Sequence, residues 1–317
     1  MDRGLLRFLI RRFLFACLLV LLVSSASLWL IAAAPGDHLS GFDVNPEIAA
    51  AERARLGLDR PIAVQYARWL AKAVTLDLGQ SLKYDRPVED LLGERAGNTA
   101  VLGGAALVFA TLLGIPIGIF TGSRRGVLSA FVRSISTVLV SIPPLVTSFI
   151  LLLFAAQTRW LPVGGFGALA AGGVRGTEFA LYLVLPCLAL ALPMAAALER
   201  LQSQAMREAL AEPTVQAARA RGCSNARIVW RHALRLSLKP VVALYGVFVG
   251  TLLSGSFAVE IVMSWPGLGA LMYEALVARD LYLVAGCAAA GAAFLAAGVL
   301  IADIALAALD PRIAETY

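Results

Sequence analysis

Charged residues are scarce in this sequence. Asp, Glu, Lys and Arg make up 15% of its 317 residues, whereas hydrophobic residues make up 59%. About a quarter of the residues in a soluble domain are charged. The apolar residues also form long runs without any charge, so they are not simply a large soluble core. The composition indicates a membrane protein. The net charge of +6 then indicates basic loops on one side of a membrane rather than a nucleic-acid partner.

Six stretches of the chain contain no Asp, Glu, Lys, Arg or His. A helix needs about 20 apolar residues to cross a hydrocarbon core of roughly 30 Å, and each stretch is long enough. We therefore predict an all-α integral membrane protein with a six-span helical bundle. The apolar run of the first stretch is too long for a cleaved secretion signal, so we expect it to be retained. The stretches cover residues 13–34, 99–122, 134–157, 179–198, 240–259 and 283–302.

The sequence also lacks the residue patterns of common catalytic and metal sites. It has only two histidines, His38 and His232, and its four cysteines form no CxxC pair. It contains no HExxH, no GxSxG and no GxxxxGK(S/T) phosphate loop. We therefore predict that the chain is not an enzyme, has no catalytic residue or metal site, and holds no cofactor of its own.

Ionisable groups are missing from the predicted spans as well. Ion-coupled transporters usually carry such groups inside the bundle, where they bind or relay the coupling ion. Asp303 comes closest, just beyond the last predicted span, where a helix-end charge explains it. If the bundle moves solutes actively, its energy must come from a partner protein.

Basic residues are unevenly distributed between the two sides that six spans define. Sixteen of the 27 Lys and Arg residues lie on the side of both termini. The other side has eleven, but eight of these lie in the 64-residue segment 35–98, and loops of that length have little influence on orientation. We therefore predict that both termini are cytoplasmic.

Segment 35–98 is predicted to be a small extracytoplasmic helical segment. Asn45 and Pro46 are a good helix start, and Gly57 would end that helix. A second helix is expected from Pro61 to Val74. Its apolar stripe could pack on the protein or lie in the membrane interface. The stripe consists of Ile62, Tyr66, Trp69, Leu70 and Ala73.

Glycines and prolines give further expectations for the spans. Gly114, Gly118 and Gly122 recur every four residues, a spacing that lets helix backbones approach closely. Prolines inside the predicted spans imply kinks. These are Pro116, Pro143, Pro144, Pro186 and Pro193.

Loop 199–239 contains the most specific pattern. Glu212 and Pro213 can start a short helix over 213–221, which Gly222 would end in a left-handed conformation. Ser224 or Asn225 can cap a second helix that leads toward Pro240. Four basic residues recur along this second helix and could contact anionic headgroups or a cytoplasmic partner. They are Arg227, Arg231, Arg235 and Lys239.

The short helix resembles a known motif. Gln216-Ala217-Ala218, three residues and Gly222 resemble the "EAA…G" loop of ABC-importer permeases, with Gln216 in place of the family's Glu. The family's I-x-L-P ending is replaced by His232-Ala233-Leu234-Arg235. Further segments resemble the dipeptide/oligopeptide/nickel branch of this family. The branch often has Pro two residues after an Arg-Asp pair, and this chain has Tyr282 at that position. The resembling segments are "LLRFLIRRFL" with "APGD", "LGLDRPIAVQYARWL", "LDLGQSL", "NTAVLGGAAL", "VEIVMSWPGLGALMYEALVARD" and "LDPR".

The resemblance implies the type I ABC-importer permease fold and a division of the chain. Residues 1–34 would be the cytoplasmic N-terminus and first span, and 35–98 the extracytoplasmic segment. Residues 99–308 would be a five-span transport domain that includes coupling loop 199–239, and 309–317 a cytoplasmic tail.

The resemblance also implies partners and site residues. Two ATP-binding subunits, which hold ATP and Mg²⁺, would receive the short helix in a groove, and a second homologous permease would complete the pathway in the inner membrane. The implied ATPase-coupling residues are Gln216, Ala217, Ala218, Arg219, Ala220, Arg221, Gly222 and His232. An extracytoplasmic solute-binding protein would dock near an outer mouth, although turn chemistry alone also explains that stretch. The outer residues are Glu260, Trp265, Pro266, Gly267, Gly269, Arg279 and Asp280.

Several functions stay open at this point. Peptides are the preferred solute, and a nickel complex or another small solute fits the same branch. An ion-coupled secondary transporter, a membrane enzyme or sensor subunit, and a channel are the competing classes. The charge-free spans argue against the first of these, and a channel has no evident use for the basic loop.

Overall fold

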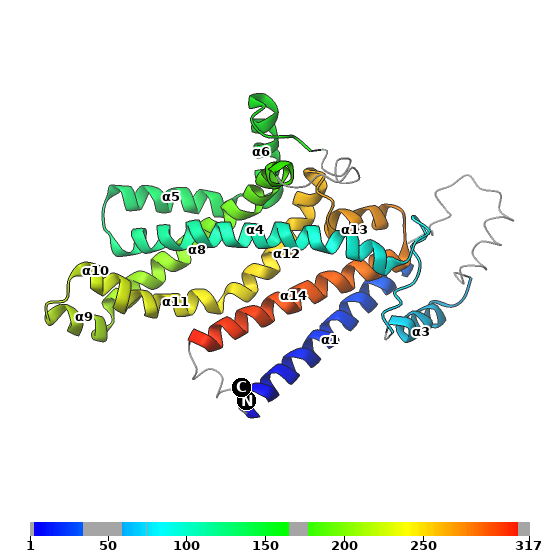
Figure 1. Ribbon diagram of the computed structural model, residues 1–317, viewed down its shortest axis with the longest axis horizontal. Helices are drawn as coiled ribbons and strands as arrows, with labels where there is room; N and C mark the ends of the chain where they lie inside the picture. Colours follow the sequence, from blue (N-terminus) through cyan, green and yellow to red (C-terminus); the bar gives the residue numbers. More distant parts are fainter. Residues whose placement is uncertain (1–2, 34–58, 74, 165–176, 310–317) are drawn as a thin grey trace. The chain divides into compact units, whose positions relative to one another are not determined.

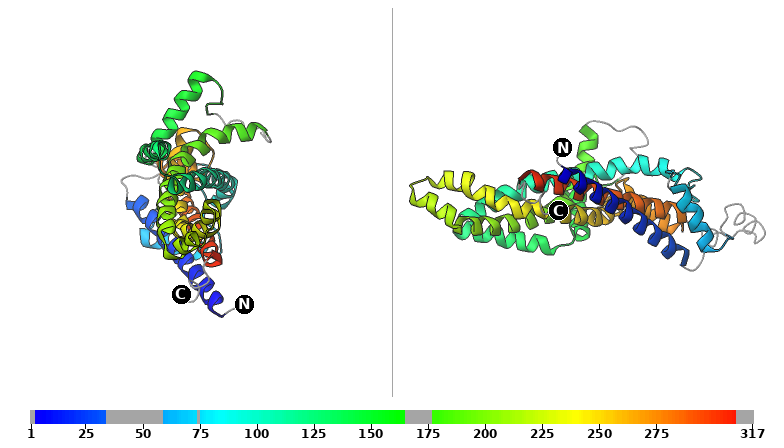
Figure 2. Two further views of the ribbon diagram at one scale, coloured as in Figure 1. Left: turned by 90° about the vertical axis from the view of Figure 1, so that its left-hand side faces the viewer. Right: turned by 90° about the horizontal axis from the view of Figure 1, so that it is seen from below.

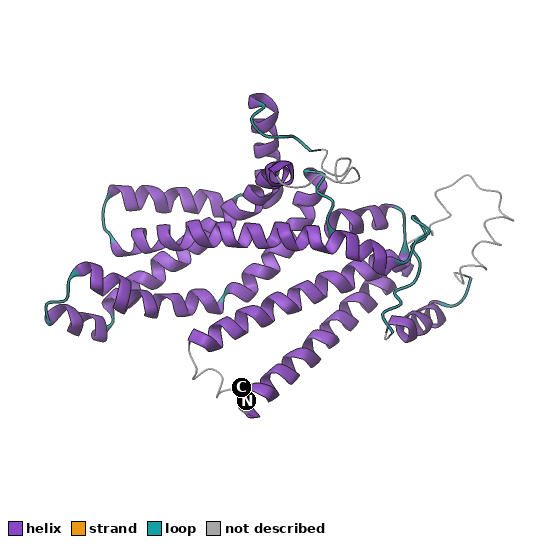
Figure 3. Cartoon of the chain, viewed as in Figure 1, coloured by secondary structure: helices purple, strands orange, loops and turns teal. Residues whose placement is uncertain are grey.

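The computed structural model describes residues 3–33, 59–73, 75–164 and 177–309 (Figure 1). Within these ranges the regular elements are all helical (Figure 3), and the one isolated β-bridge joins Gln80 to Pro87. The chain packs as two compact units. Unit 1 comprises Met1–Ile10, Ala100–Trp265 and Ala297–Tyr317, and unit 2 comprises Arg11–Thr99 and Pro266–Ala296. The four-part division expected from the sequence stays a prediction.

Among the described residues, five helices are long and apolar enough to cross a membrane. Each contains most or all of one predicted span, which confirms five of the six expected positions. The fifth predicted span begins a few residues too early, because Leu244 ends one helix before the next begins. The five helices are α1 (Arg3–Ala33), α4 (Val88–Ser123), α8 (Thr177–Ala211), α12 (Tyr245–Val262) and α14 (Leu281–Leu309).

The third predicted span, 134–157, is not one straight helix. It is divided between α5 (Val127–Ser141) and α6 (Pro144–Thr158), which are bent by 104°. Pro143 takes an extended conformation, with φ −60° and ψ 147°, and Pro144 is the first residue of α6. A residue before proline is disfavoured in the helical region, so the adjacent prolines end one helix and start the next. The predicted kink is confirmed, and the bent pair α5 and α6 gives the sixth span if the two helices are counted as one broken span.

In unit 1, α4 and α8 approach closely through the glycine stripe. A Cβ atom added to Gly118 would lie 2.7 Å from the Cβ of Gln202 and 2.8 Å from the carbonyl oxygen of Glu199. A Cβ atom added to Gly114 would lie 2.5 Å from the nearest α8 atom, and one added to Gly122 would lie 2.6 Å from it. Any side chain at these positions would push the helices apart, so the predicted close packing is confirmed.

A buried polar cluster lies at the same contact. Thr121 donates a hydrogen bond to Oε1 of Glu199, and Nε2 of Gln202 donates to Oγ of Ser237, 2.9 Å away, on α11 (Leu234–Ala243). Glu199 is 1% exposed and Gln202 is 0% exposed. Glu199 lies just beyond the fourth predicted span, 179–198, but α8 continues to Ala211. Glu199 is therefore a buried ionisable residue directly after the charge-free stretch 179–198, on a helix that continues well past that stretch.

In unit 2, α3 (Ile62–Ala73) confirms the second helix expected in the extracytoplasmic segment. Its apolar side packs on α1: the hydroxyls of Tyr66 and Ser25 lie 2.9 Å apart, and the Tyr66 ring lies 6.2 Å from that of Trp29. Trp69 is buried and donates from Nε1 to the carbonyl oxygen of Leu78 at 3.2 Å. Protein packing therefore accounts for four members of the stripe, Tyr66, Trp69, Leu70 and Ala73. The helix predicted to start at Asn45 lies outside the described residues.

Candidate functional site

The short helix predicted in the basic loop is α9 (Pro213–Ala220). Pro213 is its first residue and Glu212 precedes it in an extended conformation. Gly222 follows with φ +82°, and no atom lies within 4 Å of a Cβ built there. The backbone conformation, rather than a lack of space, is therefore what favours glycine at this turn. The helix and its glycine end are confirmed.

One side of α9 attaches it to the rest of unit 1. Val215 and Ala218 are each 1% exposed, and α9 packs on α8 and on the π-helical segment η2 (Ile228–Ala233). Nε2 of Gln216 donates to the carbonyl oxygen of Leu210 at 2.6 Å. The last carbonyls of a helix have no partner within it, and an ionised carboxylate cannot donate to one. The amide at 216 thus makes a bond that the motif's usual Glu could not.

The other side of α9 is open. Of the eight predicted coupling residues, only Ala218 is buried and His232 is half-buried. In Figure 1 and the right-hand view of Figure 2, α9 lies at the far end of the loop from α12. The exposed face combines small and basic side chains, which suits insertion into a groove of another protein. Its residues are Gln216, Ala217, Arg219, Ala220, Arg221 and Gly222.

The second helix of the loop is continuous but not uniform. It runs through α10 (Asn225–Arg227), η2 and α11. Ser224 occupies the N-cap position without a side-chain capping bond. The six residues of η2 form a π-helical segment between α10 and α11, and the basic residues Arg227, Arg231 and Arg235 along this helix are exposed.

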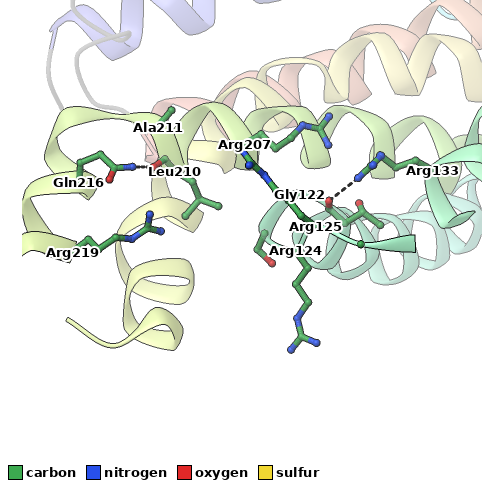
Figure 4. A pocket seen from close by; sticks show the side chains of 12 residues that line it. Gly122, Arg124, Arg125, Arg133, Arg207, Leu210, Ala211, Gln216 and Arg219 are labelled. Carbon is green, nitrogen blue, oxygen red and sulfur yellow. Dashed lines mark hydrogen bonds between the residues drawn. The ribbon is translucent and has the colours of Figure 1, made fainter. Parts of the chain in front are cut away.

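A cavity of about 700 Å³ lies between α9 and the turn that joins α4 to α5. Figure 4 shows Arg219 on the α9 side of this opening and Arg124 and Arg125 on the turn opposite it. Arg133 and Arg207 also line it. Apart from Arg219, which belongs to the predicted coupling residues, these arginines entered the prediction only through the charge count, because nothing in their spacing shows that four separate parts of the chain bring them together.

The predicted outer residues are divided between the two units. In unit 1, Glu260 is 0% exposed and Trp265 is 1% exposed. The ring of Trp265 meets that of Phe179 with centroids 5.6 Å apart, and its backbone N–H donates to the carbonyl oxygen of Glu260 at 2.9 Å. These two residues close the end of α12 by packing.

In unit 2, the remaining outer residues start α13 (Leu268–Val277) and α14. Gly267 is the N-cap of α13, and the N–H of Leu268 donates to Oγ1 of Thr99 at 2.8 Å. The carbonyl oxygen of Pro266 accepts a bond from Nδ2 of Asn98, also at 2.8 Å. Pro266, Gly267 and Gly269 are buried. Thr99 and Asn98 were not selected from the sequence, although Asn98 opens a segment that resembles the family.

Asp280 joins two distant parts of unit 2. Its carboxylate accepts hydrogen bonds from Oγ of Ser81 at 2.6 Å, from the N–H of Lys83 at 3.0 Å and from the N–H of Leu283 at 3.1 Å. It is 0% exposed. The last of these bonds caps the start of α14, while the first two hold segment 81–83. Arg279 is the one exposed member of the predicted outer set.

A charged cluster lies beside this junction. Nζ of Lys83 lies 3.0 Å from Oε2 of Glu274, and the hydroxyl of Tyr84 donates to the same oxygen. Burial works to raise the pKa of Glu274, but the hydrogen bonds from Tyr84 and Lys83 hold that pKa below its ordinary value. Burial likewise works to lower the pKa of Lys83, and the bond to Glu274 keeps that pKa above its ordinary value. The pair is therefore charged at neutral pH.

The long apolar helices and the loop with an open helix define a multi-pass membrane permease component. Residues 114–315 match the family of binding-protein-dependent transport system inner membrane components, and residues 5–101 match the N-terminal domain of such membrane components. The chain belongs to this family of transport permeases.

Curated relatives cover nearly the whole chain. The oligopeptide transport system permease protein OppB of Mycobacterium bovis is 34% identical over 322 residues, covering 97% of this chain and 98% of the relative. AppB of Bacillus subtilis, named an oligopeptide transport system permease protein, is 31% identical over 318 residues. The match covers 96% of this chain and 98% of the relative. OppB of Escherichia coli is 31% identical over 314 residues, a match that covers 98% of this chain and 99% of the relative. The chain is thus a multi-pass inner-membrane component of a binding-protein-dependent transporter.

Proposed function

We propose that this chain is one of two permease subunits in an ATP-driven importer. Two separate ATPase subunits would bind its cytoplasmic loop, and a solute-binding protein would deliver solute from outside. The family supports dependence on a binding protein. The transport step would be alternating access, in which the bundle opens first to one side of the membrane and then to the other.

The observation that carries the proposal is the two-sided construction of α9. Its outer face is exposed, so it is available to a partner. Its inner face is fixed by buried Val215 and Ala218 and by the bond from Gln216 to the end of α8. A displacement of α9 by closing ATPase subunits would therefore be passed to α8 through contacts that are already formed.

The proposal is tested by two substitutions at the turn. Gly222→Val places a branched residue in a left-handed conformation, whereas Gly222→Asn is tolerated there. Because the space around Gly222 is open, the two variants differ mainly in backbone strain. We expect Gly222→Val to lose co-purification of the ATPase subunits and Gly222→Asn to retain it. Normal ATPase co-purification and normal uptake with Gly222→Val would contradict the docking role.

We further propose peptides as the solute. The relatives' names point to oligopeptides, and a nickel complex or another small solute is the alternative within the resembling branch. Mass spectrometry of the solute that co-purifies with the partner binding protein would distinguish them. Recovery of a metal complex without peptide would overturn this assignment.

The proposed orientation places α9 and both termini in the cytoplasm. The distribution of basic residues supports it. A membrane-impermeant maleimide should label Ala220→Cys in inverted vesicles more strongly than in intact cells. The reverse pattern would contradict the orientation.

The buried carboxyl of Glu199 is the observation that favours a second candidate, an ion-coupled transporter. Its Oε2 atom has no hydrogen-bond partner among the described residues, as a proton- or ion-binding group could. Its position against Gly118 and Thr121 also serves helix packing, however, and the family is one of binding-protein-dependent transport. Uptake that survives ATP depletion and follows an ion gradient would favour this candidate.

A further inference from the structure

Five arginines surround one cavity in unit 1. They come from the α4–α5 turn, from α5, from α8 and from α9, so four separate parts of the chain contribute to the site. The cavity has a volume of about 700 Å³, enough for a phosphate-bearing headgroup. The five are Arg124, Arg125, Arg133, Arg207 and Arg219.

The charges of these arginines are not neutralised within the described part of the chain. Arg133 donates to the carbonyl oxygen of Thr121 at 3.1 Å, and Arg207 donates to Oγ of Ser203 at 3.0 Å. Arg124 lies over the ring of Phe120 at 5.2 Å. None of the five pairs with a carboxylate of the described residues. Like charges gathered around one cavity repel each other, and a bound anion would relieve this repulsion.

A second cavity, with a partly hydrophobic lining, adjoins the basic one. It has a volume of about 850 Å³ and shares Ser123, Arg124, Leu210 and Arg219 with the basic cavity. The remainder of its lining is largely hydrophobic. It includes Ile119, Phe120, Ile228, Val229 and Trp230. A basic cavity that continues along these hydrophobic side chains is better suited to bind an amphiphilic anion than a free inorganic anion.

The membrane supplies such a molecule at this level. The arginines of the turn follow directly on the apolar helix α4, and the next residues of α5 are exposed and apolar: Val127 is 87% exposed and Leu128 is 62% exposed. In the proposed orientation this end of α4 lies at the cytoplasmic leaflet. Anionic lipids there attract clustered Lys and Arg residues, and the guanidinium group binds phosphate in a bidentate manner.

We propose that the cavity binds the phosphate headgroup of an anionic phospholipid, with an acyl chain against the apolar lining of the neighbouring cavity. The site shares Gln216 and Arg219 with the exposed face of α9, and its other lining residues lie on α4, the α4–α5 turn, α5 and α8 or directly beside them. A headgroup held there would join α9 to the α4–α5 turn. The proposal depends on the proposed orientation for the choice of leaflet, but not on ATPase binding.

The test is lipid retention by the complete purified transporter, measured by native mass spectrometry. The complex is exchanged into detergent containing equal amounts of phosphatidylglycerol and phosphatidylethanolamine. The variant Arg125→Gln/Arg219→Gln removes two charges from the cavity. The control Arg227→Gln/Arg231→Gln removes two exposed charges from the same loop that do not line either cavity.

We expect the wild type and the control to retain phosphatidylglycerol preferentially, and the cavity variant to retain roughly tenfold less. Equal retention by the cavity variant and the wild type would overturn the site, as would an equal loss in the control. Complete displacement of the lipid by millimolar inorganic phosphate would overturn the lipid assignment in favour of a free-anion site. ATPase co-purification is recorded separately on the same samples, so failure of the docking proposal is distinguishable from failure of this one.

Discussion

Two segments of this chain were predicted to face partner proteins, and they are built in opposite ways. Six of the eight residues predicted on the loop around α9 are exposed, whereas six of the seven in the outer set are buried. Helix α9 is attached through two small apolar side chains and one hydrogen bond. The outer segment is held by hydrogen bonds to Thr99, Asn98, Ser81 and Lys83.

The difference shows that two recognisable motifs of one chain can have different physical roles. On α9 the motif specifies what is presented to solvent, so substitutions there should affect partner binding before they affect stability. In the outer segment it specifies contacts within unit 2, so substitutions there should affect stability first. The following predictions test this contrast, beginning with the largest expected effect.

Asp280→Ala should strongly destabilise unit 2. The substitution leaves the hydroxyl of Ser81 and the N–H groups of Lys83 and Leu283 without their acceptor in a buried site. The expected loss is about 3 kcal/mol, with a melting temperature roughly 5 °C or more below the wild type. Thermal unfolding of the purified complex measures it. Asp59→Ala, which removes an exposed acid from the same unit, is the control, and equal melting of the two variants would contradict the role of Asp280.

Gln216→Met should loosen α9 with a smaller effect on stability. The variant keeps the length of the side chain but deletes the donor to the carbonyl oxygen of Leu210. The loss of one such bond costs about 1 kcal/mol. We expect faster hydrogen exchange in α9 and unchanged exchange in α13. If exchange in α9 stays as slow as in the wild type, the amide does not fix the helix.

The interaction of Lys83 with Glu274 should give the smallest effect on stability, and the size of that effect depends on pH. The pKa of Glu274 is lowered, so its stabilising contribution is present above the ordinary value of 4.5 and is lost as the pH falls through the lowered pKa. The pKa of Lys83 is raised, so its contribution is present below 10.5 and is lost as the pH rises through the raised pKa. Both groups are partly exposed, which keeps the effect small.

Glu274→Gln should therefore lower the melting temperature slightly at pH 7, and the difference from the wild type should shrink in acid below pH 4.5. Glu89→Gln removes an exposed carboxylate from the same unit and serves as the comparison. A difference that grows in acid would show that the sign is wrong.

Local patterns allowed much of this structure to be predicted. Pro213 and Gly222 bracket α9 within ten residues, and the glycines at 114, 118 and 122 repeat along one helix. The bond between Ser81 and Asp280 spans 199 residues of sequence, and a single sequence has no local pattern for such a pair. The burial of Glu199 was missed because it depends on α8 continuing past the apolar run.

The basic cavity was missed for a related reason. Arg133 and Arg219 are 86 residues apart in the sequence and lie on different elements, which only the packing of α5, α8 and α9 brings to one opening. Counting charges by loop assigns both residues to the same predicted side. It does not show that they share a site.

The central claim is that α9 presents a docking face whose integrity is independent of the outer segment. The most direct test measures ATPase co-purification and melting temperature side by side for Ala217→Trp and Asp280→Ala. Ala217 is exposed, so the indole should block the docking face without disturbing the core. We predict that Ala217→Trp melts like the wild type but loses the ATPase subunits, while the folded fraction of Asp280→Ala retains them. Wild-type ATPase co-purification with Ala217→Trp would contradict the account.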